Sequence, residues 1–242
     1  FGVITLMAGL MQINPVWTYG PYNPAEVTAG SQPDWYMGFV EGGIRIMPNW
    51  EWHIGSTTWS WNVAIPGLGL MGLMFGLMAI YPFVEAWVTG DKSEHHILDR
   101  PRNAPTRTGV GVAGIVWYCV MWAAASSDLI ATHFLVSLND VTYWLRALFF
   151  IGPIIGFIVT RRICLALQRK DREIVLHGRE TGRIVRLPHG EFIEVHAPLD
   201  DYKLHRLVSF ESPEVQPAEP AANGKISGTE KLRGRLSRFF FE

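Results

Sequence analysis

Long apolar runs separated by polar loops occupy the first two thirds of the chain. A helix needs about 20 consecutive apolar residues to cross a bilayer, and three runs come close to that length, at residues 63–87, 109–127 and 141–160. Another run, residues 1–13, is shorter and starts in the middle of its apolar pattern. The pattern predicts an all-α membrane protein, a helix bundle made of the end of one transmembrane helix and three further ones, over residues 1–160.

Charge in the loops predicts the orientation of these helices. Residues 88–108 and the segment after residue 160 are rich in Lys and Arg, whereas residues 14–62 and 127–140 carry mostly Asp and Glu. Positively charged loops face the cytoplasm. We therefore expect a multi-pass protein of the cell membrane, with residues 14–62 as a long outer loop and the C-terminal tail in the cytoplasm.

The outer loop is dense in aromatic residues and proline. Aromatic side chains gather at membrane interfaces, and their density argues against disorder. A long ordered connection usually carries a function. Residues 37–47 fit a short amphipathic helix at the membrane surface. Pro33 restricts the backbone of the residue before it, so the turn that follows would hold its side chains in fixed positions.

The tail is expected to contain a cytoplasmic extension over residues 161–212 and a disordered segment with a basic end over residues 213–242. The first part of the extension continues the last helix. Residues 183–187 and 191–196 alternate in polarity around Pro188-His189-Gly190, which predicts a β-hairpin. The basic end is expected either to touch a membrane or a partner subunit, or to be a solvated tail; both alternatives stay open.

Composition narrows the classes further. The chain is 48% hydrophobic and has a net charge of −1, which gives no general attraction for nucleic acid. Its first residue is Phe1, so we expect the C-terminal part of a longer polypeptide, either a fragment or the product of a split gene. Cys119 and Cys164 lie in or beside different apolar runs, and we expect them to pack as small apolar residues rather than form a disulfide or a metal site.

Asp34 is the strongest candidate for chemistry, within the sequence Pro33-Asp34-Trp35-Tyr36. A charge close to hydrocarbon is costly, so a charge found there is a functional candidate. A carboxylate among aromatic side chains suits accepting a proton from an apolar substrate. The alternative is that Asp34 is a turn or cap residue with no chemical role.

The same tetrapeptide resembles the Pro-Glu-Trp-Tyr signature of the cytochrome b family, which lies in the quinol-oxidation pocket of cytochrome bc complexes. Further stretches resemble actinobacterial members of that family, at residues 12–15 with 30–34, 94–102, and 177–182 through 186–190. The resemblance covers about residues 1–200 and implies that the chain holds the end of helix five and then helices six, seven and eight. The family usually has Glu where this chain has Asp34, which is one methylene shorter.

The resemblance implies a subunit of a respiratory quinol–cytochrome c reductase that is catalytic only in the assembled complex. The complex would oxidise menaquinol at the outer face and release protons there, passing one electron to a Rieske iron–sulfur protein and the other to haem b. Asp34 and Tyr36 are the implied catalytic residues. Asp34, partly buried, would accept a proton, and Tyr36 would hydrogen-bond the carboxylate or a quinol oxygen. Pro33 and Trp35 would form the wall of the substrate pocket.

The resemblance also implies two haems b, held by histidine pairs on helices outside this chain, so we expect no metal ligand among its residues. We expect the adjacent His95 and His96 to be structural, because neighbours on a regular element point in different directions. The implied partners are the N-terminal half of cytochrome b, a Rieske iron–sulfur subunit and a cytochrome c subunit. They would form a dimeric complex in the lipid membrane, associated in actinobacteria with a terminal oxidase.

Two other classes compete with this interpretation, a transporter subunit and a non-catalytic membrane anchor. A transporter would favour charged residues inside its spans, and these spans carry almost none. An anchor would tolerate changes at Asp34 and Tyr36. One of the few charges in a span, Arg146, is expected either to extend to the interface or to pair with Asp128 or Asp140.

Overall fold

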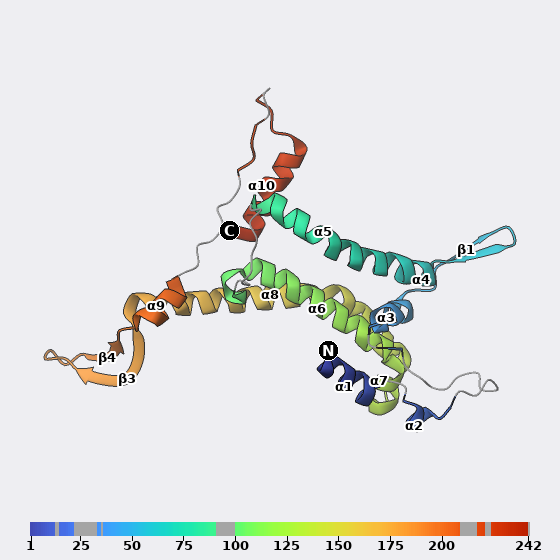
Figure 1. Cartoon of the computed structure of the whole chain (residues 1–242), viewed down its shortest axis with the longest axis horizontal. Coiled ribbons are helices and arrows are strands. Elements are labelled where there is room, and N and C mark those ends of the chain that lie inside the picture. The colour runs from blue at the N-terminus through green and yellow to red at the C-terminus, as the bar shows by residue number, and fades with distance from the viewer. Residues whose placement is uncertain are drawn as a thin grey trace. The chain divides into compact units, whose positions relative to one another are not determined.

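The computed structural model describes residues 1–12, 15–21, 33–34, 36–90, 100–208, 217–220 and 224–241. Helices make up most of these residues, and two short antiparallel hairpins complete the regular structure (Figure 1). The chain falls into two compact units, Phe1–Ala79 with Ala113–Ile154, and Ile80–Val112 with Ile155–Glu242. Three long helical stretches contribute residues to both units.

These three stretches are, among the described residues, the ones long and apolar enough to cross a membrane: Trp61–Thr89, α6 (Pro105–Ala125) and α8 (Leu138–His177). They confirm the three predicted spans. In the most apolar part of each, only 6%, 22% and 6% of the residues are buried inside the chain. Since exposed apolar surface is unfavourable in water, these helices require lipid or other apolar helices around them.

The first stretch combines α4 (Trp61–Ala64), a π-helical turn η1 (Ile65–Leu70) and α5 (Met71–Thr89). Pro66 lies in the π-helical turn and Pro82 lies inside α5. Membrane helices tolerate such prolines because neighbouring groups satisfy the carbonyls that they free. Beyond the local helix backbone, no described atom lies within 4 Å of the position a Cβ would take at Gly67, Gly69, Gly72 or Gly76. This helix therefore keeps room for the close approach of another helix.

Helix α3 (Gly38–Ile46) confirms the short amphipathic helix predicted at residues 37–47. Its apolar face is buried against α6 and α8 in the first unit (Figure 1). The buried members of the two apolar clusters that hold it are Phe39, Val40, Ile46, Met121, Ala124, Val141 and Leu145. Packing against segments far along the chain therefore fixes α3.

Three further helices belong to the first unit, α1 (Gly2–Leu10), α2 (Val16–Tyr19) and α7 (Ser127–Phe134). α1 is nine residues long and lies in the apolar run expected to be the end of one transmembrane helix. α7 follows α6 almost directly and ends at Leu135, whose backbone is left-handed with a φ of 55°. α7 is therefore a separate helix and does not lengthen α6.

A hairpin that the sequence analysis did not predict follows α3. β1 (Glu51–Ile54) and β2 (Thr57–Ser60) pair antiparallel, with Trp52 opposite Trp59. The two-residue loop begins with Gly55, whose φ is 63°, as tight hairpin turns require. A glycine-serine pair between aromatic and β-branched residues is a hairpin signal. We interpreted these aromatic residues as lying at the membrane interface and so did not predict the hairpin.

Ion pairs join loops to helices in the second unit. Arg102, in the 3₁₀ turn η2 (Pro101–Asn103), donates to both carboxylate oxygens of Asp171 on α8, at 2.8 Å each. Arg107 of α6 pairs with Glu85 of α5 at 3.1 Å. A single nitrogen of Arg102, Nη1, makes both contacts. Charge-assisted hydrogen bonds of this kind are short and strong, so the first of these pairs fixes η2 against the C-terminal part of α8.

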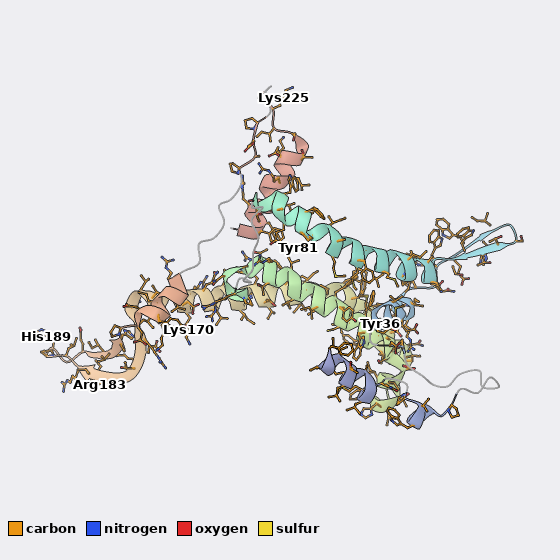
Figure 2. The ribbon with its side chains drawn as sticks, viewed as in Figure 1. Tyr36, Tyr81, Lys170, Arg183, His189 and Lys225 are labelled. Atoms are coloured by element: carbon orange, nitrogen blue, oxygen red, sulfur yellow. The ribbon has the colours of Figure 1, made fainter. Side chains whose placement is uncertain are left out.

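The tail begins with the predicted hairpin. β3 (Arg179–Arg186) and β4 (Phe192–Ala197) pair antiparallel, and the turn between them carries His189 (Figure 2). Helix α9 (Asp201–Val208) follows. The helix α8 itself runs on to His177, so the continuation of the last span beyond residue 160 is confirmed.

Helix α10 (Gly228–Phe241) lies within the part of the tail that the sequence predicts to be disordered. Its first turn is capped, because Ser227 Oγ accepts a hydrogen bond from the Glu230 amide at 3.2 Å. Near its end the ring of Phe239 stacks on Phe157 of α8, with 6.0 Å between the ring centroids. A cap and an aromatic contact thus support a helix over the basic end of the tail.

Candidate functional site

The turn that begins at Pro33 brings its two candidate catalytic residues together. Tyr36 Oη donates a hydrogen bond to Asp34 Oδ2 at 2.9 Å. The Met37 amide donates to the Asp34 carbonyl at 2.9 Å, which closes the turn. Pro33 is half-buried, and Trp35 lies outside the described residues. Asp34 and Tyr36 therefore act as one unit, a carboxylate with a phenol donor.

Among the described residues, none covers the Asp34 side chain, which is exposed, and Tyr36 is 54% exposed. The expected partial burial of Asp34 among Trp35 and Tyr36 stays a prediction, because Trp35 lies outside the described residues. The hydrogen bond to Asp34 and the negative charge of that carboxylate raise the pKa of Tyr36. A raised pKa keeps the phenol protonated at neutral pH, so Tyr36 remains a donor there.

Helix α3 starts directly after this turn and serves as its support. The backbone of α3 lies against α6 with no room for side chains at two glycines. A Cβ at Gly38 would stand 2.5 Å from Cδ1 of Trp122, and one at Gly42 would stand 1.6 Å from the Met121 carbonyl oxygen. Two glycines four residues apart let helix backbones approach closely. Their spacing is a signal in the sequence from which this contact could have been predicted.

Arg146 of α8 fixes the other end of α3. Its Nε donates to the Ile46 carbonyl at 2.6 Å and its Nη2 to the Met47 carbonyl at 3.4 Å. The last carbonyls of a helix lack partners within the helix, and a cation near them interacts favourably with the helix dipole. Arg146 thus caps the C-terminus of α3, in place of the expected alternative of an ion pair with Asp128 or Asp140; its extension to the membrane interface stays a prediction.

Asp128 has a different cationic partner. Arg45 of α3 donates to Asp128 of α7 at 2.9 Å and to Glu41 one turn earlier at 3.0 Å. Arg45 and Asp128 are 83 positions apart. Their pair therefore links α3 to α7, as Arg146 links α3 to α8. Sequence reasoning missed both contacts, because neither a backbone acceptor nor a distant ion pair leaves a local pattern.

The remaining candidates do not join this site. His53 is exposed on β1, with Nδ1 3.0 Å from Thr58 Oγ1. Cys119 is exposed, Cys164 is buried, and both are free thiols. The structure does not describe His95, His96 or the stretches 13–14, 30–32 and 94–99, which the sequence analysis named.

One group among the described residues has the spacing of metal ligands. Glu180, Glu194 and His196 have ligand atoms within 4.8 Å of one another, and all three are exposed on the β3–β4 hairpin. No second feature of that hairpin points to an ion. The Asp34–Tyr36 pair, in contrast, offers proton chemistry: an acceptor for a substrate hydroxyl proton beside a donor for a substrate oxygen.

Known proteins provide an independent comparison. The chain is 53% identical to the cytochrome bc1 complex cytochrome b subunit of Streptomyces coelicolor, over all of the chain and 45% of that relative. It is 48% identical to that of Streptomyces lividans, over 85% of the chain and 39% of the relative. It is 47% identical to that of Mycobacterium tuberculosis, over 84% and 37%. No protein-family model matches the chain. The chain thus spans less than half the length of the curated relatives it matches.

Proposed function

We propose that this chain, which belongs to the cytochrome b family, forms part of the outer-face site at which a respiratory bc1 complex oxidises quinol. The observation that supports this most directly is the hydrogen-bonded Asp34–Tyr36 pair at the start of a helix with fixed ends. A proton acceptor contributes to catalysis only when it is held in reach of the proton that it abstracts. The packing of α3 supplies that constraint.

In the proposed step, Asp34 accepts a proton from a hydroxyl group of the quinol. Tyr36 stays protonated, orients the carboxylate through its 2.9 Å hydrogen bond, and can turn its donor to a quinol oxygen when Asp34 becomes neutral. Pro33 and Trp35 form part of the pocket wall. Because the Asp34 side chain is a methylene shorter than Glu, we expect the quinol to lie closer to the backbone of the turn than it would with Glu.

Haem b and a Rieske iron–sulfur cluster supply the electron acceptors when they are bound in the complex. The residues of this chain do not fit haem ligation in the membrane, since its three described spans carry no histidine before His177. We assign the two haems b to the preceding part of the cytochrome b subunit.

The same relatives and the loop charges also support proposals on the substrate, the partners and the orientation in the membrane. We propose that menaquinol is the substrate and that the enzyme is a menaquinol–cytochrome c reductase of the cell membrane. Its partners would be the N-terminal half of cytochrome b, a Rieske subunit and a cytochrome c subunit, in a dimer associated with a terminal oxidase. The C-terminal tail would face the cytoplasm.

Asp34→Asn in the complete complex tests the proposal. The substitution keeps the shape of the side chain but removes the proton acceptor, and general-base catalysis contributes about 10²- to 10⁴-fold. We expect quinol–cytochrome c turnover to fall about 100-fold or more, with the haem absorbance spectrum and complex yield unchanged. Asp34→Glu should keep much of the activity, because it restores a carboxylate.

Near-normal turnover of the Asp34→Asn complex would overturn the proton-acceptor role. That outcome would favour the alternative in which this chain is a non-catalytic anchor. A fall in turnover with a parallel loss of haem would instead indicate a damaged assembly. The Asp34→Glu complex then decides: if the carboxylate is the proton acceptor, this complex turns over faster than the Asp34→Asn complex, and if the carboxylate is purely structural, the two turn over equally.

A further inference from the structure

A cleft of about 950 Å³ lies in the second unit. Five segments surround it: the residues around η2, the last turns of α8, the start of β3, the end of β4 with Leu199, and α9. Its volume is that of many small-molecule sites, which range over about 300–1,000 Å³. Nothing in the proposed quinol chemistry uses it.

The lining of this cleft is basic. Five of its residues carry a permanent positive charge, and only Glu173 and Glu180 carry a negative one. The positive residues are Arg100, Arg102, Lys170, Arg179 and Lys203. Charges of one sign that line a concave surface reinforce one another and raise the local concentration of counter-ions. The cleft therefore attracts anions.

Two of these five cations hold the walls together. Arg102 is bound to Asp171 through both of its carboxylate oxygens, and Lys203 pairs with Asp200 at 2.9 Å. Among the residues that the structure describes, the other three, Arg100, Lys170 and Arg179, have no carboxylate partner. They come from three different segments (Lys170 is labelled in Figure 2), so an anion that reaches all three bridges these segments.

The backbone at Gly178 shapes one wall. Its φ is 88° and a Cβ there would stand 2.6 Å from the Ala197 carbonyl oxygen, so only glycine fits. This close approach joins the end of α8 to the end of β4 and places Arg179 beside the His196 strand. Apolar residues complete the lining, Ile174, Leu199 and Leu207.

The distance from the membrane distinguishes two sources of a phosphate group. Arg161 and Arg162 are the first charges after the apolar run of α8 and so mark the edge of the hydrocarbon. Lys170 is eight residues beyond Arg162, which places it roughly 12 Å further along the helix. The headgroup layer is only about 5–8 Å thick on each side. The cleft therefore lies beyond lipid headgroups, within reach of soluble anions.

We propose that this cleft binds a soluble phosphorylated ligand of nucleotide size. Its phosphate groups contact Arg100, Lys170 and Arg179, and its uncharged part lies against Ile174 and Leu199. Basic side chains of this kind, above all arginine, make charge-assisted hydrogen bonds with phosphate oxygens. The ligand joins η2, α8 and β3 and thereby couples the tail of the subunit to the concentration of that ligand.

Titration of the purified complex with ATP tests this proposal, with binding heat as the measurement. We expect one saturable site per copy of this chain and weaker binding at higher salt. The double variant Lys170→Glu/Arg179→Glu should bind about 100-fold more weakly, because it removes two charge-assisted contacts of about tenfold each. The matched control is Arg183→Glu/Arg186→Glu, which makes the same change of charge on β3 outside the cleft lining (Figure 2). It should bind within about twofold of wild type.

A footprint on the unmodified complex keeps the test independent of variant folding. ATP should protect Lys170 and Lys203 from an amine-reactive reagent and leave Lys225 labelled (Figure 2). The same protection should occur in nanodiscs of neutral lipid. Protection that needs anionic lipid and not ATP would assign the cleft to a headgroup and overturn the proposal. So would lysines that are already covered by another subunit, absence of saturable binding, or equal binding by the double variant.

Discussion

Arg146 offers a direct way to separate the support of the Asp34 turn from its chemistry. Arg146→Met keeps most of the length and apolar stem of the side chain but removes both donors to the end of α3. The Nε bond to the buried Ile46 is short, at 2.6 Å, whereas the Nη2 bond to Met47 is long, at 3.4 Å. The first bond therefore carries most of the effect.

A hydrogen bond from a charged donor contributes about 1.5–3 kcal/mol. Loss of the Nε bond thus weakens the docking of the C-terminal end of α3 by about 2 kcal/mol. This lowers the ratio of docked to undocked α3 by a factor of about 30. Since a displacement of about 1 Å in a catalytic group can cost about 100-fold in rate, we expect turnover to fall by up to about 30-fold. The fall should appear in kcat, because the variant keeps every pocket residue.

The assay is quinol–cytochrome c turnover of the purified complex over a range of quinol concentrations, with the apparent melting temperature measured in parallel. Arg146→Lys retains one donor without the planar fork and should recover part of the loss. Arg162→Met, an exposed position on the same helix, is the matched control and should match wild type. Wild-type turnover together with a wild-type melting temperature in Arg146→Met would refute the reasoning that this contact supports the site.

Two further predictions concern the same unit. Gly42→Ala places a Cβ 1.6 Å from the Met121 carbonyl oxygen, so we expect a strong loss of assembled complex on a gel. Gly228→Ala, outside the spans and with no described atom within 4 Å of its added Cβ, should assemble normally, and equal yields would contradict the close packing. Tyr36 has a raised pKa and stays protonated from neutral to mildly alkaline pH, since its donor function is lost only as the pH rises through that pKa. Tyr36→Phe should therefore lower turnover by the same factor throughout this range, and a difference from wild type that disappears on the alkaline side would show that the phenol titrates there.

The periodic elements could be predicted from the sequence because their signals are local. Apolar runs predicted the three spans, the amphipathic pattern at residues 37–47 predicted α3, and alternation around Pro188-His189-Gly190 predicted the β3–β4 hairpin. The neighbourhood of Asp34 and Tyr36 in one turn also followed from the sequence. What sequence reasoning missed depends on distant partners or on weak local signals.

Three cases show why. The acceptors of Arg146 are backbone carbonyls 100 and 99 positions earlier in the chain, and carbonyls have no letter in a sequence. α10 covers the basic end of the tail, where Phe239 meets Phe157 some 80 positions away, a contact that leaves no local pattern. The β1–β2 turn at Gly55 did leave a local signal, but the aromatic residues around it also fit a membrane interface.

The contact between Arg146 and the end of α3 also has a consequence for biogenesis. Translation delivers α3 first and Arg146 only about 100 residues later, so the support of the Asp34 turn cannot close until α8 has entered the membrane. Until that moment the nascent subunit displays the whole tetrapeptide without a site. A product truncated before α8 would carry every residue of the motif but lack the contact that supports it, so closure of this support depends on the insertion of α8.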